Sequence, residues 1–372
     1  MRWVFALVIV VHGLIHVMGL VKGFGLAELP QLTLPITRGM GVVWFLAALL
    51  CLASVVALFA WPRGWWALGL AAVVLSQFVI ITAWSDAKFG TVPNIVLLLA
   101  AVYGYLTLGP ASFRAQFERA ATAGIERPSS APLVTEADLA PLPEPVRRYL
   151  RATGMVGQPR IHNYRLRFRG RIRSGPDNRW MPFVANQQSF ADVPTRLFLM
   201  DATFLGVPVQ AFHRLSGGHA TMVVKAVGAV TIVDESGPEM DRAEAVTLFN
   251  DMCLLAPSTL LEPGIAWEAV DARTARARFT NGANTISATL VFDDEGLLTN
   301  FFSDDRSRST TGAKAFVPQR FSTPVQEYRR FGPYRLVARA EARWHPPEGA
   351  FAYGEFEVLD VAYNIREPEG TL

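Results

Sequence analysis

The first third of the sequence has very little charge, and the whole chain has only two cysteines. Charged residues are almost absent between Trp3 and Leu108, whereas the rest of the chain has the composition of a soluble domain. Cys51 falls in an apolar run and Cys253 in a segment with helical periodicity, so the sequence offers no disulfide framework or metal-binding cysteine pair. The 372 residues therefore predict two dissimilar parts.

A dense basic surface and the usual catalytic signatures are also missing. The net charge is +3 and is carried almost wholly by arginine, which does not indicate a nucleic-acid-binding face but is compatible with a domain near anionic lipid. There is no phosphate-binding loop or nucleophile elbow. Asp304-Asp305-Arg306 could be an acid–base cluster, yet after a strand it more often marks an exposed turn with an ion pair. We therefore expect no cofactor and find no positive reason to predict an enzyme.

Four apolar runs fill residues 1–110, namely Trp3–Val21, Gly39–Trp61, Trp65–Trp84 and Val92–Leu108. A membrane-spanning helix needs about 20 such residues, and the tryptophans at the ends of these runs suit the bilayer interface. A cleaved signal peptide is the weaker interpretation of the first run, because three more runs follow it. The sequence predicts a four-helix transmembrane domain over residues 1–110. A small excess of arginine and lysine places both chain ends, and so the second domain, on the cytoplasmic side.

His12 and His16 lie four residues apart in the first run and therefore share a helix face. Two histidines at membrane depth could ligate a metal or haem. The alternative is a structural role, in which they hydrogen-bond across the bundle to polar side chains of other spans, namely Ser76, Gln77, Thr82 or Asn94.

Residues 111–141 read as a juxtamembrane helix, Phe113–Ile125, and a linker, and a short helix is expected at Glu144–Ala152. A strand with a basic stripe follows, because Arg165, Arg167, Arg169, Arg171 and Arg173 alternate with apolar residues. We predict that this stripe contacts membrane lipid phosphates. The alternative is a solvated face whose arginines pair with acids on the neighbouring strand.

Period-two alternation continues through most of residues 142–366 and is broken once by a helix predicted at Asp241–Ala256, with Asp241 and Glu244 as a capping box. Among the expected strands are single long ones at Ala220–Val233 and Gln319–Phe331. Ten or eleven antiparallel strands around one helix predict a curved sheet or half-barrel wrapped on that helix. Such a sheet leaves an apolar cavity, for which Phe249, Cys253 and Trp267 are the candidate lining residues.

Several motifs stand between Leu142 and Asn364: Pro143-Glu-Pro-Val-Arg-Arg-Tyr149 with Gly154, Gly237-Pro-Glu-Met-Asp241, Leu255-Ala-Pro-Ser-Thr-Leu-Leu261, Trp267-Glu-Ala-Val-Asp271, Phe292-Asp-Asp-Glu-Gly296 and Asp305-Arg306. Together they resemble a bacterial family catalogued only as a domain of unknown function. The family usually has Trp-Phe-Pro-Thr-Ala-Leu-Leu where this chain lacks the aromatic pair. The resemblance implies no activity and no catalytic residues. The order of strands and helix is also similar to the lipoprotein-carrier type of half-barrel, which holds acyl chains.

Three functions from different classes remain open. The first and favoured one is a membrane-anchored module that binds a lipid or other hydrophobic ligand in the β domain. The second is a structural or regulatory membrane protein whose β domain docks a protein partner, which predicts a filled core and an exposed apolar patch. The third is an enzyme acting on a membrane substrate, which predicts titratable side chains converging in the cavity.

Overall fold

A computed structural model of the chain describes residues 2–309 and 316–367. The chain divides into two compact units, Met1–Gln116 and Phe117–Leu372.

The first unit is helical, with α1 (Arg2–Gly23), α2 (Arg38–Ala60), α3 (Trp65–Thr82), the short α4 (Trp84–Ala87) and η1 (Lys88–Gly90), and α5 (Thr91–Leu108). Four helical stretches, the last of them running from Trp84 to Ile125, are long and apolar enough to cross a membrane. Glycines allow α1 and α2 to approach closely, since a Cβ on Gly19 would lie 2.1 Å from the ring of Trp44.

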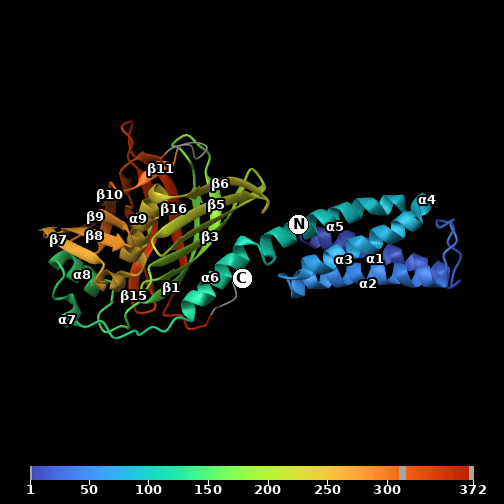
Figure 1. Ribbon diagram of the computed structural model, residues 1–372, viewed down its shortest axis with the longest axis horizontal. Helices are drawn as coiled ribbons and strands as arrows, with labels where there is room; N and C mark the ends of the chain where they lie inside the picture. Colours follow the sequence, from blue (N-terminus) through green and yellow to red (C-terminus); the bar gives the residue numbers. More distant parts are fainter. Residues whose placement is uncertain (1, 310–315, 368–372) are drawn as a thin grey trace. The chain divides into compact units, whose positions relative to one another are not determined.

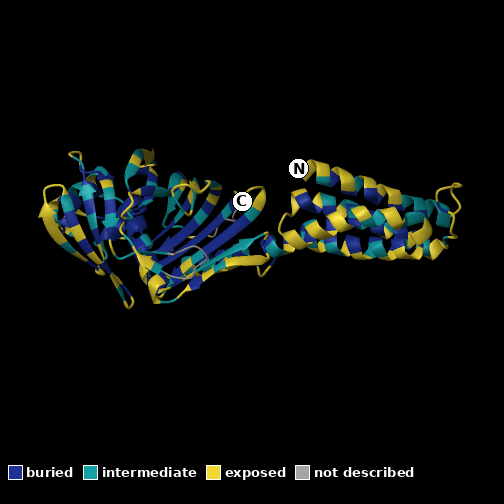
Figure 2. Ribbon diagram, turned by 90° about the horizontal axis from the view of Figure 1, so that it is seen from above, coloured by how far each residue is buried: buried dark blue, intermediate teal, exposed yellow. Residues whose placement is uncertain are grey.

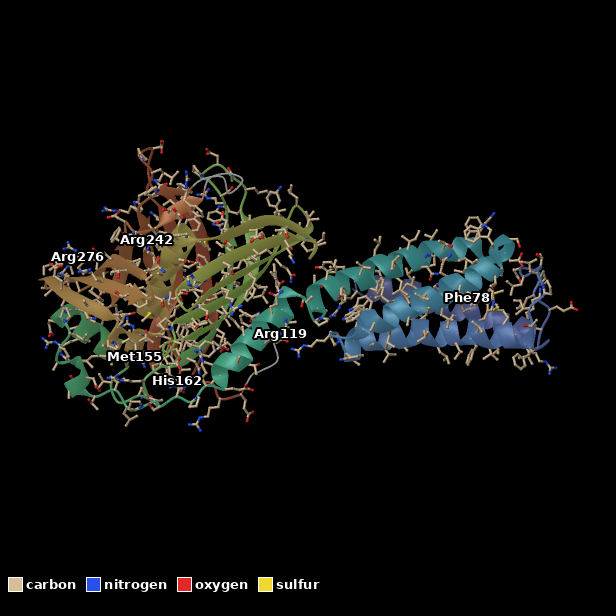
Figure 3. The ribbon with its side chains drawn as sticks, viewed as in Figure 1. Phe78, Arg119, Met155, His162, Arg242 and Arg276 are labelled. Atoms are coloured by element: carbon tan, nitrogen blue, oxygen red, sulfur yellow. The ribbon has the colours of Figure 1, made fainter. Side chains whose placement is uncertain are left out.

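Many residues of this helical unit are exposed (Figure 2), and large apolar residues are prominent among them. Trp3 is 75% exposed and Val74 is 71% exposed, and Phe78 on α3 is half exposed (Figure 3). An apolar exterior on all sides is typical of helices that face lipid.

The second unit is mostly β (Figure 1). Its helices are α6 (Phe113–Ile125, which begins in the first unit), α7 (Glu136–Leu139), α8 (Glu144–Ala152), α9 (Pro238–Leu255) and η2 (Pro257–Leu261). Its strands are β1 (Asn163–Ile172), β2 (Met181–Phe190), β3 (Thr195–Phe204), β4 (Val207–Ser216), β5 (His219–Ala226), β6 (Val230–Ser236), β7 (Ile265–Asp271), β8 (Thr274–Asn281), β9 (Asn284–Phe292), β10 (Leu298–Ser303), β11 (Ser307–Ser309), β12 (Phe316–Pro318), β13 (Phe321–Ser322), β14 (Val325–Phe331), β15 (Tyr334–Trp344) and β16 (Phe351–Tyr363).

Fourteen of the described strands form one sheet in the order β6-β5-β4-β3-β2-β1-β16-β15-β13-β10-β9-β8-β7, with β14 also paired to β15. All of the pairings are antiparallel, and the pairing of β1 with β16 joins the two halves of the sheet. The predicted order of four long apolar helices followed by a curled antiparallel half-barrel is confirmed (Figure 1).

Two expected strands are each broken in the structure. Ala220–Val233 was predicted as one strand, but it is the β5–β6 hairpin, whose turn contains Val227 and Gly228 at φ values of 46° and 72°. Gln319–Phe331 was also predicted as one strand, but it divides into β13 and β14 around Pro324, which has no N–H to donate to a ladder. The predicted capping box is wrong as well, because α9 begins at Pro238 and Asp241 lies inside it, accepting a hydrogen bond from the backbone N–H of Ala220.

The outer face of strands β2–β4 is covered by α6. The ring of Phe117 lies 6.3 Å from that of Phe212, and a Cβ on Gly124 would overlap the ring of Phe190. The other face of the same strands looks toward α9. Strand β3 is therefore buried on both faces over Thr195–Met200, which explains why a charged residue on its inner face is removed from solvent.

Candidate ligand cavity in the β domain

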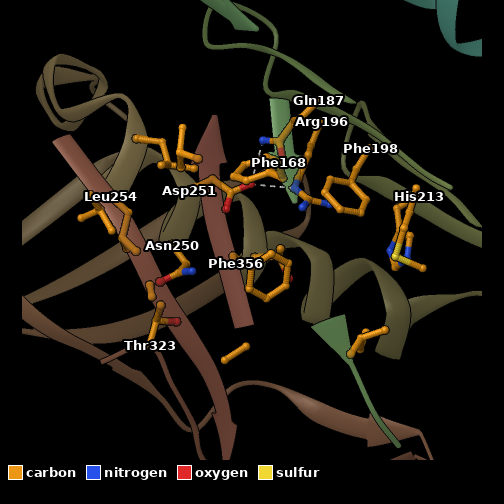
Figure 4. A pocket seen from close by; sticks show the side chains of 18 of the residues that line it. Phe168, Gln187, Arg196, Phe198, His213, Asn250, Asp251, Leu254, Thr323 and Phe356 are labelled. Carbon is orange, nitrogen blue, oxygen red and sulfur yellow. Dashed lines mark hydrogen bonds and ion pairs between the residues drawn. The ribbon is translucent and has the colours of Figure 1, made fainter. Parts of the chain in front are cut away.

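A cavity of about 150 Å³ lies between α9 and the sheet (Figure 4). Alternate residues of the strands point into it, as the two-residue period of a strand requires. Most of its lining is apolar and includes Phe168, Ile172, Phe183, Phe198, Met200, Leu254, Phe321, Val337, Ala340, Phe356 and Val358.

A buried ionic cluster forms the polar part of the lining. Arg196 on β3 is only 7% exposed; its Nε donates to Asp251 Oδ2 at 2.7 Å and its Nη1 to Glu244 Oε2 at 3.3 Å. Gln187 on β2 donates its amide N–H to the same Asp251 oxygen at 2.8 Å. His213 Nδ1 lies 3.5 Å from Glu244 Oε1. Three strands and one helix are therefore tied together around a single guanidinium.

Electrostatics in this cluster keep both partners ionised. Burial acts to raise the pKa of Glu244, but the interaction with His213 and the positive charge of Arg196 outweigh it and lower the pKa to about 2. Burial likewise opposes the charge of Arg196, yet Asp251 and Glu244 outweigh it and raise the pKa of the guanidinium. Arg196 and Glu244 are thus a matched pair of charges, and Glu244 is not poised to donate or accept a proton at neutral pH.

Arg306 supplies a second cation to the cavity wall. Its Nη1 donates to the hydroxyl of Tyr353 at 2.9 Å, and its guanidinium lies 4.4 Å from the ring centroid of Phe321. With Arg196, Arg306, Glu244 and Asp251 together, the lining holds two cations and two anions. The charges balance without help from a bound ion.

Several buried polar atoms in the cavity lining have no hydrogen-bond partner among the described residues. They are Gln187 Oε1, Asn250 Oδ1, Thr323 Oγ1, Arg306 Nε and His213 Nδ1, the last of which lies 3.5 Å from Glu244 Oε1. An unpaired buried polar atom costs about 1–3 kcal/mol. The orientation of Gln187 is set by its amide donation to Asp251, so its oxygen is left as a free acceptor. The cavity therefore retains unused hydrogen-bonding capacity beside an apolar wall.

The candidate residues Phe249, Cys253 and Trp267 are not among those lining this cavity. Phe249 is fully buried and stacks on Phe279 at 5.1 Å, with Trp267 at 6.4 Å. Cys253 is also fully buried, and its carbonyl accepts a hydrogen bond from the hydroxyl of Tyr149 at 2.7 Å. Phe249 and Cys253 lie on one face of α9 and Trp267 lies on β7. The cavity is lined by another face of α9, through Glu244, Thr247, Asn250, Asp251 and Leu254.

The arginine stripe of β1 lies along the β16 pairing. Arg169 and Arg171 make two hydrogen bonds each, at 2.7–2.9 Å, to Glu357 and Glu355. Arg165 lies 4.0 Å from Asp360, Arg167 is exposed, and Arg173 donates to the carbonyl of Ala352 at 2.9 Å. The pairing predicted as the alternative to lipid contact is present for three of these arginines.

His12 and His16 lie in a buried polar cluster of the helical unit. His12 Nε2 is 3.1 Å from Ser76 Oγ and 2.9 Å from Asn94 Oδ1, and His16 Nε2 is 2.9 Å from the same serine oxygen. The cross-bundle hydrogen bonds that the structural alternative predicts to Ser76 and Asn94 are therefore present. Within the described residues, no group of three or more His, Cys, Asp or Glu side chains is placed to hold a metal ion.

Residues of the sequence motifs mainly hold separate elements of the fold together through hydrogen bonds. Tyr149 of the first motif anchors α8 to α9, and Arg148 Nη2 donates to the carbonyl of Asp294 at 2.7 Å, holding the turn of another motif. In Asp304-Asp305-Arg306, the two acids pair outward with Arg320 and Arg242, while Arg306 turns into the cavity.

The site residues that sequence reasoning missed are Gln187, Arg196, Glu244, Asn250 and Asp251. One signal was available. Arg196 has the same strand parity as Phe198 and Met200, so a charged residue stood in an inward-facing row of β3.

Comparisons with known proteins give a family and a few distant structural likenesses. A DUF1329 family protein from Desulfovibrio piger is 12% identical, with a TM-score of 0.34, over 55% of this chain and 87% of that one. A LolA superfamily protein from Nitrosomonas europaea is 8% identical, with a TM-score of 0.32, over 62% of this chain and 94% of that one. None of the curated proteins matches the chain. The family of unknown function DUF6544 matches residues 132–356, more than half of the chain, so the predicted resemblance is confirmed and the chain belongs to that family.

Proposed function

We propose that this protein is a membrane-anchored module whose β domain binds a hydrophobic ligand that carries an uncharged polar group. The observation that carries the proposal is the set of unpaired polar atoms facing an otherwise apolar cavity, above all Gln187 Oε1 and Asn250 Oδ1. An apolar pocket with a few convergent polar groups is the usual form of a small-molecule site.

The charges of the lining decide the chemistry of the polar group. Because Arg196 and Arg306 are matched by Glu244 and Asp251, an ionic ligand would leave one charge without compensation. Gln187 Oε1 needs a donor, which a hydroxyl or amide N–H supplies. A cavity of about 150 Å³ holds a group the size of benzene. A long acyl chain therefore occupies it only in part, and the remainder extends out of the cavity.

The helical unit supplies the anchor in this proposal. Its four long apolar helices span a bacterial cytoplasmic membrane, with both chain ends on the cytoplasmic side. The four spans and the small arginine and lysine excess of the sequence support this arrangement. In this proposal Arg167, an exposed member of the stripe, contacts lipid phosphates.

An enzymatic function is the second candidate, because Glu244, Asp251 and His213 converge in the cavity as that hypothesis predicts. A general acid or base near neutral pH works best with a pKa close to 7. The pKa of Glu244 is moved the other way, to about 2, by His213 and Arg196 against the effect of burial. Glu244 is therefore better suited to shaping a binding site than to transferring protons.

The test is to identify small molecules that co-purify with the full chain. Wild type is compared with Ala340→Phe, which fills the cavity, and with Ala266→Phe, a control at an exposed position. Extracts are analysed by mass spectrometry after purification in the same detergent. Lipids around the apolar helices are common to all three samples, so only the cavity ligand differs between them.

We expect a molecule retained by wild type and by Ala266→Phe and at least tenfold depleted in Ala340→Phe. Identical extracts from all three proteins would contradict the proposal. Thr323→Val changes the lining without adding bulk and serves if Ala340→Phe does not fold.

A further inference from the structure

Two hairpin turns of the β domain lie side by side at one end of the sheet. The β3–β4 and β5–β6 turns point the same way because consecutive antiparallel strands alternate in direction. The backbone N–H of Val227 donates to the carbonyl of Pro208 at 2.9 Å and links the two turns. Six exposed apolar residues form what is here called the hairpin-tip patch: Phe204, Leu205, Val207, Val227, Val230 and Ile232.

The patch contains two bulky residues in a strained backbone conformation. Leu205 has φ 51° and Val227 has φ 46°, in the left-handed region that glycine or asparagine adopts at much lower cost. The β4–β5 turn at the opposite end uses Gly217 and Gly218, at φ 61° and 81°. At the tip end, large exposed apolar side chains occupy strained positions where a small or polar residue would fit better.

An aromatic residue with cations stands at the same end of the sheet. The β1–β2 connection ends there and carries Trp180, whose ring lies 4.6 Å from the guanidinium of Arg171 and 4.4 Å from that of Arg173. Tryptophan and arginine together favour the headgroup layer of a bilayer, where the ring and the charge are both well solvated.

The chain also enters the β domain toward this end. Within the domain, α6 runs along β2–β4 with Gly124 at Phe190 and Phe117 further along, at Phe212. Phe190 pairs with Thr195 at the end of the strands opposite the tips. The part of α6 near Phe117 is therefore closer to the tips than the part near Gly124. Only eight residues separate Phe117 from Leu108, the last residue of α5. Four of those residues already belong to α6, so only four residues connect α5 to α6.

We propose that the hairpin-tip patch inserts into the interfacial layer of a phospholipid bilayer. The inference goes beyond ligand binding but rests on the proposed membrane anchor. The cavity is oriented to match, since its lining residues Ile172 and Phe183 lie near the tip ends of β1 and β2, whereas Arg196 lies near the far end of β3. A docked domain thus presents the apolar end of its cavity to the membrane.

The experiment places an environment-sensitive fluorophore on the tips of the full chain in phosphatidylcholine vesicles. Leu205→Cys and Val230→Cys are labelled in separate proteins, and the native Cys51 and Cys253 are both buried. Val193→Cys is the matched control, because Val193 is an apolar residue, 43% exposed, in the β2–β3 turn at the opposite end. Lipids with a nitroxide on the acyl chain act as quenchers.

We expect quenching at positions 205 and 230 to exceed quenching at 193 by at least twofold, with blue-shifted emission. Equal quenching at all three positions would overturn docking while leaving the anchor intact. Failure of the protein to float with the vesicles would instead overturn the anchor. One preparation therefore tests the two proposals separately, the anchor by flotation and the docking by quenching.

A paired variant separates docking from folding. Leu205→Asn with Val227→Asn removes two apolar side chains, and asparagine tolerates the left-handed backbone. In this background the label at position 230 should lose at least half of its quenching while the melting temperature of the β domain does not fall. Unchanged quenching would overturn the proposal.

Discussion

Each unit of this protein buries a polar cluster, and the two clusters differ in what they leave unpaired. In the helical unit, His12, His16, Ser76 and Asn94 satisfy one another, with distances of 2.9–3.1 Å at the shared serine and asparagine oxygens. In the β domain, Arg196 is paired with Asp251 at 2.7 Å and with Glu244 at 3.3 Å, yet Gln187 and Asn250 keep free acceptors beside a cavity. Burial of polar groups therefore does not by itself mark a site. A site is marked instead by polar atoms that lack a hydrogen-bond partner and lie next to a cavity.

The largest expected effect comes from breaking the ionic cluster of the β domain. Arg196→Met leaves Glu244 and Asp251 buried without their cation and should lower the unfolding free energy by about 3–5 kcal/mol. The measurement is thermal unfolding of the full chain followed by near-ultraviolet circular dichroism. Arg276→Met, which removes an exposed pair with Glu268, is the control and should cost less than about 1 kcal/mol. Similar losses in the two variants would contradict the assignment.

Acid should weaken the same cluster in a defined pH window. The pKa of Glu244 is lowered from 4.5 to about 2, with His213 and Arg196 outweighing the opposing effect of burial. A carboxyl with a depressed pKa stabilises the fold above its unfolded pKa and loses that contribution as the pH falls toward the folded value. Between pH 5 and 2 the loss should approach about 3 kcal/mol. Glu244→Gln should flatten this part of the profile, and Glu268→Gln should not.

The helical cluster is tested by deleting its shared hydroxyl. Ser76→Ala removes the group that both histidines contact and should destabilise the bundle by about 1 kcal/mol, the size usual for hydrogen bonds between membrane helices. Helix loss is followed against the mole fraction of dodecyl sulfate. Ser54→Ala removes a hydroxyl bonded only within its own helix, to the carbonyl of Cys51, and should change less. An equal effect of the two substitutions would mean that the cluster does not hold the helices together.

The smallest expected change in stability is that of Asn250→Leu, and it distinguishes the two clusters most clearly. Asn250→Leu replaces an amide whose oxygen is unpaired with an apolar side chain of similar size and should raise the stability of the empty β domain by about 0.5–1 kcal/mol. The same change should reduce the amount of co-purifying ligand. At Ser76, where every partner is satisfied, no apolar substitution should stabilise. A loss of stability in Asn250→Leu would show that its amide is already paired.

Local patterns were sufficient to predict the elements and the resemblance, and insufficient to predict the cavity. Phe249 was predicted to line the cavity, but it lies in the core. Glu244 was predicted as part of a capping box and Asp251 was not singled out, because nothing local shows that strands cover their face of the helix. Cross-strand acids opposite Arg169 and Arg171 became visible only when β16, some 190 residues away, paired with β1.

The errors in strand boundaries have the same origin. A turn at Val227 was not predicted, because a β-branched residue rarely adopts a left-handed backbone. Pro324, by contrast, was a visible break signal inside the predicted Gln319–Phe331 strand. Partners for His12 and His16 were predictable because polar residues are so few in the apolar runs that Ser76 and Asn94 stood out.

The pairing of β1 with β16 also sets the order in which the β domain can be completed during synthesis. The six strands from β1 to β6 can pair with one another as they emerge. The other edge of β1 stays unpaired until β16, which begins at Phe351, has been made. At about 5–20 residues per second, a ribosome needs on the order of 10–40 s to make the intervening chain. Throughout that time an unpaired strand edge is exposed. A truncation that removes β16 would make that state permanent and yield an aggregation-prone domain.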